Sequence, residues 1–309
     1  MHAESRLTWR LCTRRAVATA WLLAAVWLIL TPAISVDAQA RPDARYAVRG
    51  MVLRVDAANR VFWVSHDRIE GLMDAMTMPF EVRDAAELGA LVPGAIVEFA
   101  LVVSSSVGYA TDIRVRRYES AEQDPLTARR LAILTRAAGR VAPPVAIGQR
   151  VPDFELIDQL RQRVKLSSLA GKVVALNFIY TRCALPQFCL RVSNTFGVLQ
   201  KRFATYLGRD LVLLTVTFDP ERDTPEVLAA YGAQWNANPA VWHFLTGSVP
   251  EVRRVGGMFG VDFFPDEGLM NHSVRSAIVD RRGRLVANVE GNQFTPEQFG
   301  DLLRSVVEP

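Results

Sequence analysis

The chain has 309 residues, half of them hydrophobic, with a formal net charge of +4 and three cysteines. Residues 1–40 contain four arginines and two acids, so the rest of the chain carries only about +2, which excludes a strongly basic nucleic-acid-binding surface. The roughly 270 residues that follow are long for one domain and suffice for two.

Residues 1–40 have the three parts of a secretory signal peptide. A cluster of arginines precedes an apolar run, Ala16–Leu30, and the small-x-small tripeptide Ala38-Gln39-Ala40 comes after it. We expect cleavage after this tripeptide and export to the periplasm. The alternative is an uncleaved anchor in the inner membrane, because the apolar stretch approaches the length that crosses a bilayer.

Residues 41–118 predict a small all-β domain. Val48–Val55 and Val61–Val64 have strand composition and flank a turn sequence, and further strands are expected at 96–103 and 113–115. Several short strands in so short a segment favour a small barrel of the OB type. Residues 119–145, which are charged, alanine-rich and end near two prolines, are expected to form a linker.

Residues 146–309 predict an α/β domain of the thioredoxin-like class. Val173–Ile179 and Leu211–Val216 are continuous apolar runs, as expected of strands buried on both faces. Helices are predicted to begin at Thr224, Ser248 and Thr295, where N-cap residues are followed by proline or glutamate. A terminal hairpin is expected within 276–289, which completes the order of elements of this fold.

Two cysteines remain outside the signal peptide, which contains Cys12. Cys183 follows the first central strand and Cys189 leads into a helix, where backbone N–H groups and the helix dipole lower a thiol pKa. We therefore expect a functional pair rather than an ordinary structural disulfide. His272 precedes the strand at 276–279 and is expected alongside the cysteine loop. Two thiolates and one imidazole suit Cu(I), whereas zinc would need a fourth ligand.

A second candidate metal site lies in the all-β region. Met73, Met76 and Met78 fall within six residues, and the last two share one face of a strand because side chains alternate. His66, at the end of the preceding strand, is expected beside them. Thioethers and an imidazole also suit Cu(I), and the alternative is a methionine-lined part of the core.

The segment 148–303 resembles the Sco/SenC family of thioredoxin-fold copper proteins. The resemblance rests on the cysteine loop 180–189, on Thr217–Thr224 and on Asn271-His272-Ser273. It implies Cys183, Cys189 and His272 as copper ligands, and delivery of copper to the binuclear centre of cytochrome c oxidase. Five residues separate the two cysteines here, where the family usually has three.

The all-β segment resembles the CusF-like periplasmic copper-binding domains. The matching residues are Ser65-His66, Gly71–Met73 and Ala75–Phe80. The resemblance implies a site made by His66, Met76 and Met78, with Met73 as an additional ligand.

The two resemblances together predict an exported metallochaperone for copper, bound as Cu(I) with Cu(II) as the alternative. The expected partners are subunit II of cytochrome c oxidase or another copper acceptor, and a periplasmic thiol reductant. No nucleic-acid partner is expected. Association with the membrane is expected only through an uncleaved signal anchor. The alternatives are a thiol–disulfide oxidoreductase, with Cys183 as nucleophile and Cys189 as resolving thiol, and a copper-tolerance buffer.

Overall fold

The computed structural model describes residues 44–104, 107–118, 143–183, 186–266 and 269–308, with isolated positions between 126 and 133. The expected signal peptide and nearly all of the expected linker lie outside these residues. Residues 43–309 form one compact unit. None of the helices that the structure describes has the length and hydropathy needed to span a bilayer.

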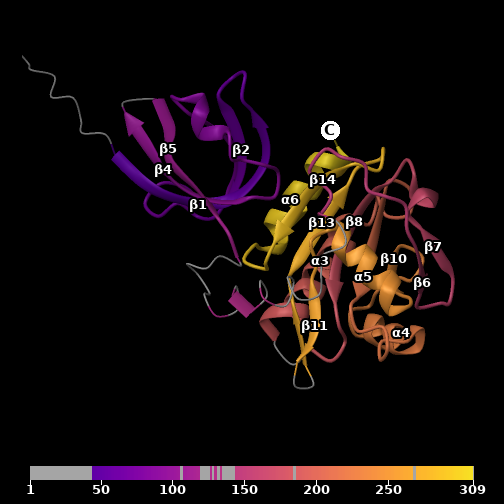
Figure 1. The fold of residues 1–309 in the computed structure, drawn as a ribbon. Helices are drawn as coiled ribbons and strands as arrows, with labels where there is room; N and C mark the ends of the chain where they lie inside the picture. The colour runs from indigo at the N-terminus through magenta and orange to yellow at the C-terminus, as the bar shows by residue number, and fades with distance from the viewer. Residues whose placement is uncertain are drawn as a thin grey trace, which may run out of the picture. The chain divides into compact units, whose positions relative to one another are not determined.

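The N-terminal part is a five-stranded antiparallel sheet with the order β3-β2-β1-β4-β5 (Figure 1). Its strands are β1 (Ala44–Asp56), β2 (Val61–His66), β3 (Met76–Glu81), β4 (Ile96–Ser104) and β5 (Val107–Arg116), with a short 3₁₀ turn η1 (Ala85–Leu88). The all-β prediction is confirmed. Among the residues that the structure describes, the hydrogen-bond ladder does not close into a barrel, since only an isolated bridge between Val82 and Ala110 joins the two edges.

One face of this sheet packs around three phenylalanines. The rings of Phe62, Phe80 and Phe99 have centroids 4.9–6.0 Å apart and all three are buried. Met51, Leu53 and Ile96 are buried within a different apolar cluster, the one built around the C-terminal sheet. The five-stranded sheet therefore contributes to two cores.

The C-terminal part is a seven-stranded sheet with the order β14-β13-β8-β9-β10-β6-β7. β8, β9 and β10 are parallel, and β13 runs antiparallel to β8. The α/β thioredoxin-like prediction is confirmed. The strands are β6 (Glu155–Asp158), β7 (Arg163–Lys165), β8 (Val173–Ile179), β9 (Leu211–Thr217), β10 (Trp242–Thr246), β13 (Arg275–Val279) and β14 (Leu285–Glu290).

Four α-helices and a small hairpin accompany this sheet among the described residues. They are α3 (Arg191–Arg202), α4 (Pro225–Gln234), α5 (Val249–Met258) and α6 (Pro296–Val307), with β11 (Phe263–Asp266) pairing with β12 (Leu269–His272). Thr224, Ser248 and Thr295 are the N-caps of α4, α5 and α6, as predicted. Every residue of β8 and β9 is buried, as expected for central parallel strands.

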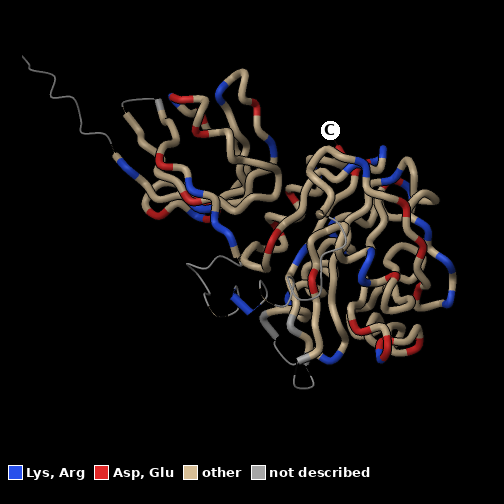
Figure 2. The backbone as a smooth tube through the Cα atoms, in the orientation of Figure 1, with Lys and Arg blue, Asp and Glu red and all other residues tan. Residues whose placement is uncertain are grey.

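Basic and acidic positions are interspersed along the described chain (Figure 2). Several ion pairs join two exposed side chains, such as Arg163 with Glu155 at 2.8 Å, and contribute little to stability. The pair between Arg202 of α3 and Asp301 of α6 is different, because both side chains are only about a quarter exposed.

Candidate metal centres

The cysteine loop begins where β8 ends. Cys183 lies four residues after that strand, and Cys189 lies in a π-helical turn, η3 (Pro186–Leu190), that continues into α3. Both thiols are buried, no disulfide joins them, and they are hydrogen-bonded to each other. The five-residue spacing therefore still brings the two sulfurs together.

The protonation of Cys189 differs from the expectation. Its hydrogen bond with Cys183, followed by burial, raises the pKa of the Cys189 thiol, so the expected lowering at a helix N-terminus is wrong for this residue. The physical reasons are the neighbouring thiol, whose hydrogen bond favours the protonated form of Cys189, and desolvation, since Cys189 is 2% exposed and a thiolate there would lose its hydration. A soft metal ion must displace this proton before the sulfur becomes a ligand.

His272 ends β12 and lies in an aromatic environment. Its ring centroid is 4.4 Å from that of Phe218 and 5.9 Å from that of Tyr180. Nδ1 lies 3.1 Å from the carbonyl oxygen of Ser273, which fixes Nδ1–H as the donor and leaves the Nε2 lone pair for a ligand. Burial lowers the pKa of His272, so the imidazole is held neutral, in the form that binds metals.

Tyr180 connects the cysteines to the histidine. This residue is 3% exposed, and burial together with Cys183 raises its pKa to about 12. The two thiols lie together, and His272 contacts the ring of Tyr180 from β12. Within the described part of the chain, no three His, Cys, Asp or Glu side chains already form a metal-binding group. Copper loading would therefore require the imidazole and the two thiols to come closer together.

Asp223 supports the cysteine loop through hydrogen bonds, a role that the sequence did not reveal. Its carboxylate is 1% exposed and accepts hydrogen bonds from the backbone N–H of Thr181 (3.1 Å), the hydroxyl of Thr181 (2.6 Å) and the hydroxyl of Thr217. Burial raises the pKa of Asp223. Asp219 braces the same loop through Arg182 at 3.0 Å. The only signal in the sequence is the pair of aspartates, Asp219 and Asp223, between β9 and α4.

The methionine and histidine residues of the N-terminal sheet lie on two paired strands. His66 ends β2 and stands directly opposite Met76 of β3, while Met78 stands opposite Val64. Cross-strand partners point to one face, so His66, Met76 and Met78 share a face as predicted. Met73 forms a bridge with Ile69, and both Met73 and Met78 pack against the phenylalanine core. Met76 is 53% exposed at the rim.

His66 has a buried nitrogen without a hydrogen-bond partner. Its Nδ1 lies 2.7 Å from the carbonyl oxygen of Asp67 and acts as the donor, which leaves Nε2 as a buried, unsatisfied acceptor. Leaving such an atom unpaired costs about 1–3 kcal/mol. The donor set and the orphaned nitrogen both fit a soft metal ion. Trp63 lies on the opposite face of β2, under Arg54 at 3.8 Å, and does not cover this site.

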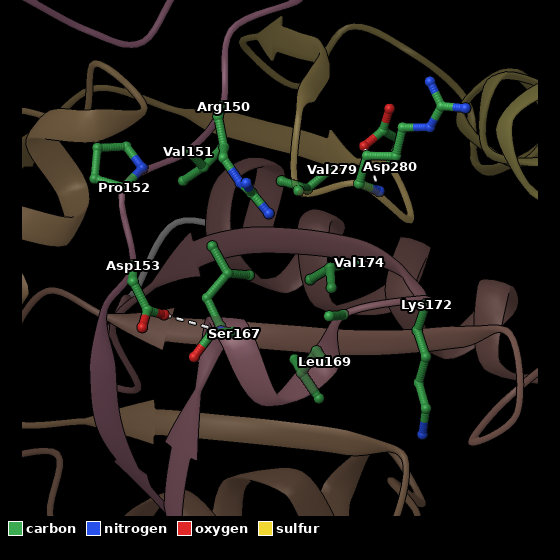
Figure 3. A pocket seen from close by; sticks show the side chains of 14 residues that line it. Arg150, Val151, Pro152, Asp153, Ser167, Leu169, Lys172, Val174, Val279 and Asp280 are labelled. Atoms are coloured by element: carbon green, nitrogen blue, oxygen red, sulfur yellow. Dashed lines mark hydrogen bonds between the residues drawn. The ribbon is translucent and has the colours of Figure 1, made fainter.

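One cavity in the thioredoxin-like part lies away from both sets of candidate ligands. It has a volume of about 360 Å³ and is lined by Val151, Leu169, Val174 and Val279 among others (Figure 3). Val174 is near the start of β8, whereas the cysteine loop follows its end. Asp153 at the cavity wall accepts the backbone N–H of Ser167 at 2.9 Å. The lining contains no Cys, His or Met, so the cavity is not a site for a soft metal.

Comparison with known proteins assigns a family to each part. The profile of the SCO1/SenC family matches residues 147–308, and that of the copper binding periplasmic protein CusF matches residues 45–115. Two relatives are Protein sco1 of Schizosaccharomyces pombe, 28% identical over 56% of this chain and 66% of its own, and the SCO1 protein homolog of Bacillus subtilis, 29% identical over 52% and 82%. The match to the first spans about two thirds of that relative's length. The solved structure of yeast Sco1 with copper bound is 25% identical, with a TM-score of 0.45 over 54% of this chain and 90% of that one.

Proposed function

Because the chain belongs to the SCO1/SenC family and carries a CusF-like domain at its N-terminal side, we propose that it is an exported copper chaperone. It holds Cu(I) at Cys183, Cys189 and His272 and delivers it for assembly of the binuclear copper centre of cytochrome c oxidase. The observation that carries this proposal is the pair of adjacent buried thiols, with a partly buried, neutral imidazole that contacts the ring of Tyr180 at the start of the same loop. Periplasmic location and the domain limits 41–118 and 146–309 are part of the proposal.

The chemistry of the cysteine site favours Cu(I) over harder ions. Thiolate sulfur is a soft ligand, and no carboxylate belongs to the proposed ligand set. The carboxylate of Asp223, which supports the loop directly, is occupied by three hydrogen bonds. Binding releases the protons of the two thiols, so the affinity should rise with pH.

The methionine site supplies a different kind of copper ligation. Thioether sulfur carries no proton and does not form disulfides, so Met76 and Met78 bind Cu(I) in an oxidising compartment where the cysteine pair is lost to oxidation. His66 completes the set through its orphaned Nε2. Tethering both sites in one chain raises their effective concentration and favours transfer from the methionine site to the thiols.

A second function, thiol–disulfide exchange, is favoured by one observation. Cys189 is more deeply buried than Cys183, at 2% against 8%, and its pKa is raised. This arrangement suits Cys183 as the attacking thiol and Cys189 as the resolving thiol in reducing the cysteines of a copper-site acceptor. A copper-tolerance buffer would use the same ligands without a dedicated acceptor.

The test is anaerobic Cu(I) stoichiometry on reduced residues 41–309. We expect two tightly bound copper ions in the parent, with one lost in His272→Ala and the other lost in the double variant Met76→Ala/Met78→Ala. His243→Ala is the matched control, because His243 is occupied by Asp158 at 3.0 Å outside both sites. If His272→Ala bound copper as the parent does, and the cysteines were rapidly oxidised and reduced in exchange with a protein disulfide, the chaperone proposal would be rejected in favour of the reductase.

A further inference from the structure

α6 of the thioredoxin-like part contacts the two strands that carry the methionine–histidine site. We propose that Gln298 and Asp301 of α6 are positioning residues for that site, so that copper binding at His66, Met76 and Met78 is coupled to the packing of α6. This inference rests on the proposed copper site of the CusF-like domain. It adds a function to residues that touch no metal ligand side chain.

Four hydrogen bonds carry the contact. The Nε2 of Gln298 donates to Asp67 Oδ1 at 2.9 Å and to the carbonyl oxygen of Ser65 at 3.3 Å. Asp301 Oδ2 accepts from the hydroxyls of Ser65 at 2.7 Å and of Thr77 at 3.0 Å. Gln298 is 5% exposed and Ser65 is 4% exposed, so the bonds that these two residues make are shielded from water, whereas Thr77 is exposed.

The contacted residues alternate with the proposed ligands. His66 lies between Ser65 and Asp67, and Thr77 lies between Met76 and Met78. Successive side chains of a strand point to opposite faces, so the ligands face one way and the residues bound by α6 face the other. α6 therefore holds both ligand-bearing strands from the face opposite to the ligands, without entering the metal site.

One hydrogen-bond chain runs from α6 to the imidazole. Gln298 holds the side chain of Asp67, and the carbonyl oxygen of Asp67 accepts Nδ1–H of His66. That last bond sets the tautomer and the ring orientation that leave Nε2 for the metal. The position of Asp67 thus determines where Nε2 points.

α6 is itself firmly anchored. Arg202 of α3 forms an ion pair with Asp301 and donates to the carbonyl oxygen of Glu297 at 2.9 Å. Leu302 and Leu303 of α6 are buried in the same apolar cluster as Met51 and Leu53 of β1. A rigid helix can therefore hold the ligand strands in one arrangement before copper arrives.

The sign of the coupling follows from preorganisation. A segment that is already ordered loses less conformational entropy on binding, so removing the bonds from α6 should weaken copper binding. We expect about a tenfold increase in the dissociation constant of the methionine–histidine site for each lost residue. By linkage, copper must strengthen the packing of α6 by the same factor.

Gln298→Glu is the most selective variant, because it changes only the bonds under test. Gln298 also accepts the backbone N–H of Thr295 at 3.0 Å in the capping box of α6, and glutamate keeps this bond while removing the donor to Asp67 and Ser65. Asp301→Asn is the second variant. Thr295→Ala is the matched control, because it removes the cap of α6 but leaves the contacts to β2 and β3.

The experiment uses residues 41–309 carrying Cys183→Ser and Cys189→Ser, so that only the methionine–histidine site binds. Competition with a Cu(I) chelator gives the dissociation constant, and hydrogen exchange of the apo proteins reports the order of residues 65–67. We expect weaker binding and faster exchange in Gln298→Glu and Asp301→Asn, with neither in Thr295→Ala. Unchanged binding in both test variants would overturn the inference and leave the copper site intact. Absence of binding in the parent would instead overturn the proposed site itself.

Discussion

Asp223→Asn tests whether the buried carboxylate beneath the cysteine loop determines how well the thiols hold copper. Asparagine keeps the shape and one accepting oxygen, but its amide nitrogen cannot accept. At least one of the three hydrogen bonds from Thr181 and Thr217 is therefore lost. Such a loss costs about 1–3 kcal/mol, which lowers Tm by about 2–4 °C per kcal/mol in a protein of this size.

The same substitution should weaken copper binding at the thiols. Releasing the anchor at Thr181 frees the backbone that leads to Cys183, and ordering one residue costs about 1–2 kcal/mol. We therefore expect the Cu(I) dissociation constant of the cysteine site to rise about tenfold, because 1.4 kcal/mol is a factor of ten. Chelator competition under anaerobic conditions measures it.

Asp158→Asn is the matched control for this prediction. Asp158 is 0% exposed and accepts two backbone N–H bonds, but it lies on β6, separated from β8 by two strands. Both variants should lose stability, whereas only Asp223→Asn should lose copper affinity. An unchanged dissociation constant in Asp223→Asn, with stability lowered as in the control, would refute the argument that Asp223 positions the loop.

The pH dependence of stability separates the charge of Asp223 from its hydrogen bonds. Burial raises the pKa of this carboxyl above its ordinary value of 3.8. The stability linked to its protonation is therefore fully present below pH 3.8 and is lost as the pH rises through the folded-state pKa. Denaturant titrations of the parent and Asp223→Asn at several pH values should show this loss in the parent alone.

Three further predictions concern other parts of the molecule. Gly50→Ala would place a Cβ 2.5 Å from the carbonyl oxygen of Ser65, a backbone atom that cannot move without straining the strand. We therefore expect denaturant titration to show a free energy of unfolding lower by about 1–3 kcal/mol, together with weaker copper binding in the N-terminal domain. The pKa of Asp301 is lowered, because its hydrogen bonds outweigh the effect of burial. The stability linked to this shift is therefore present above pH 3.8 and is lost as the pH falls through the folded-state pKa. Acid unfolding of Asp301→Asn should lack this step. Phe218→Leu removes the ring 4.4 Å from His272 and should accelerate Cu(I) dissociation from the thiols several-fold in stopped-flow chelation, whereas equal rates would show that the ring does not hold the imidazole.

Local patterns in the sequence determined the fold class and most of the candidate ligands. The apolar runs of β8 and β9 and the N-caps at Thr224 and Thr295 depend on residues a few positions apart, so they are legible without a structure. The pairing of Met76 with Met78 on one face follows from the period of a strand. The choice of Cys183, Cys189 and His272 required the family resemblance as well.

Only the tertiary structure decided how those residues are held. The pKa of Cys189 follows from burial and from a neighbouring thiol, which reversed the expectation based on its helix position. Asp223 reaches Thr181 across 42 positions, and Gln298 reaches Asp67 across 231. Such bonds have no local signature, because a hydrogen bond requires two groups within about 3 Å of each other whatever their separation along the chain. The sequence therefore names the candidate ligands, and the packing of distant elements determines their protonation and geometry.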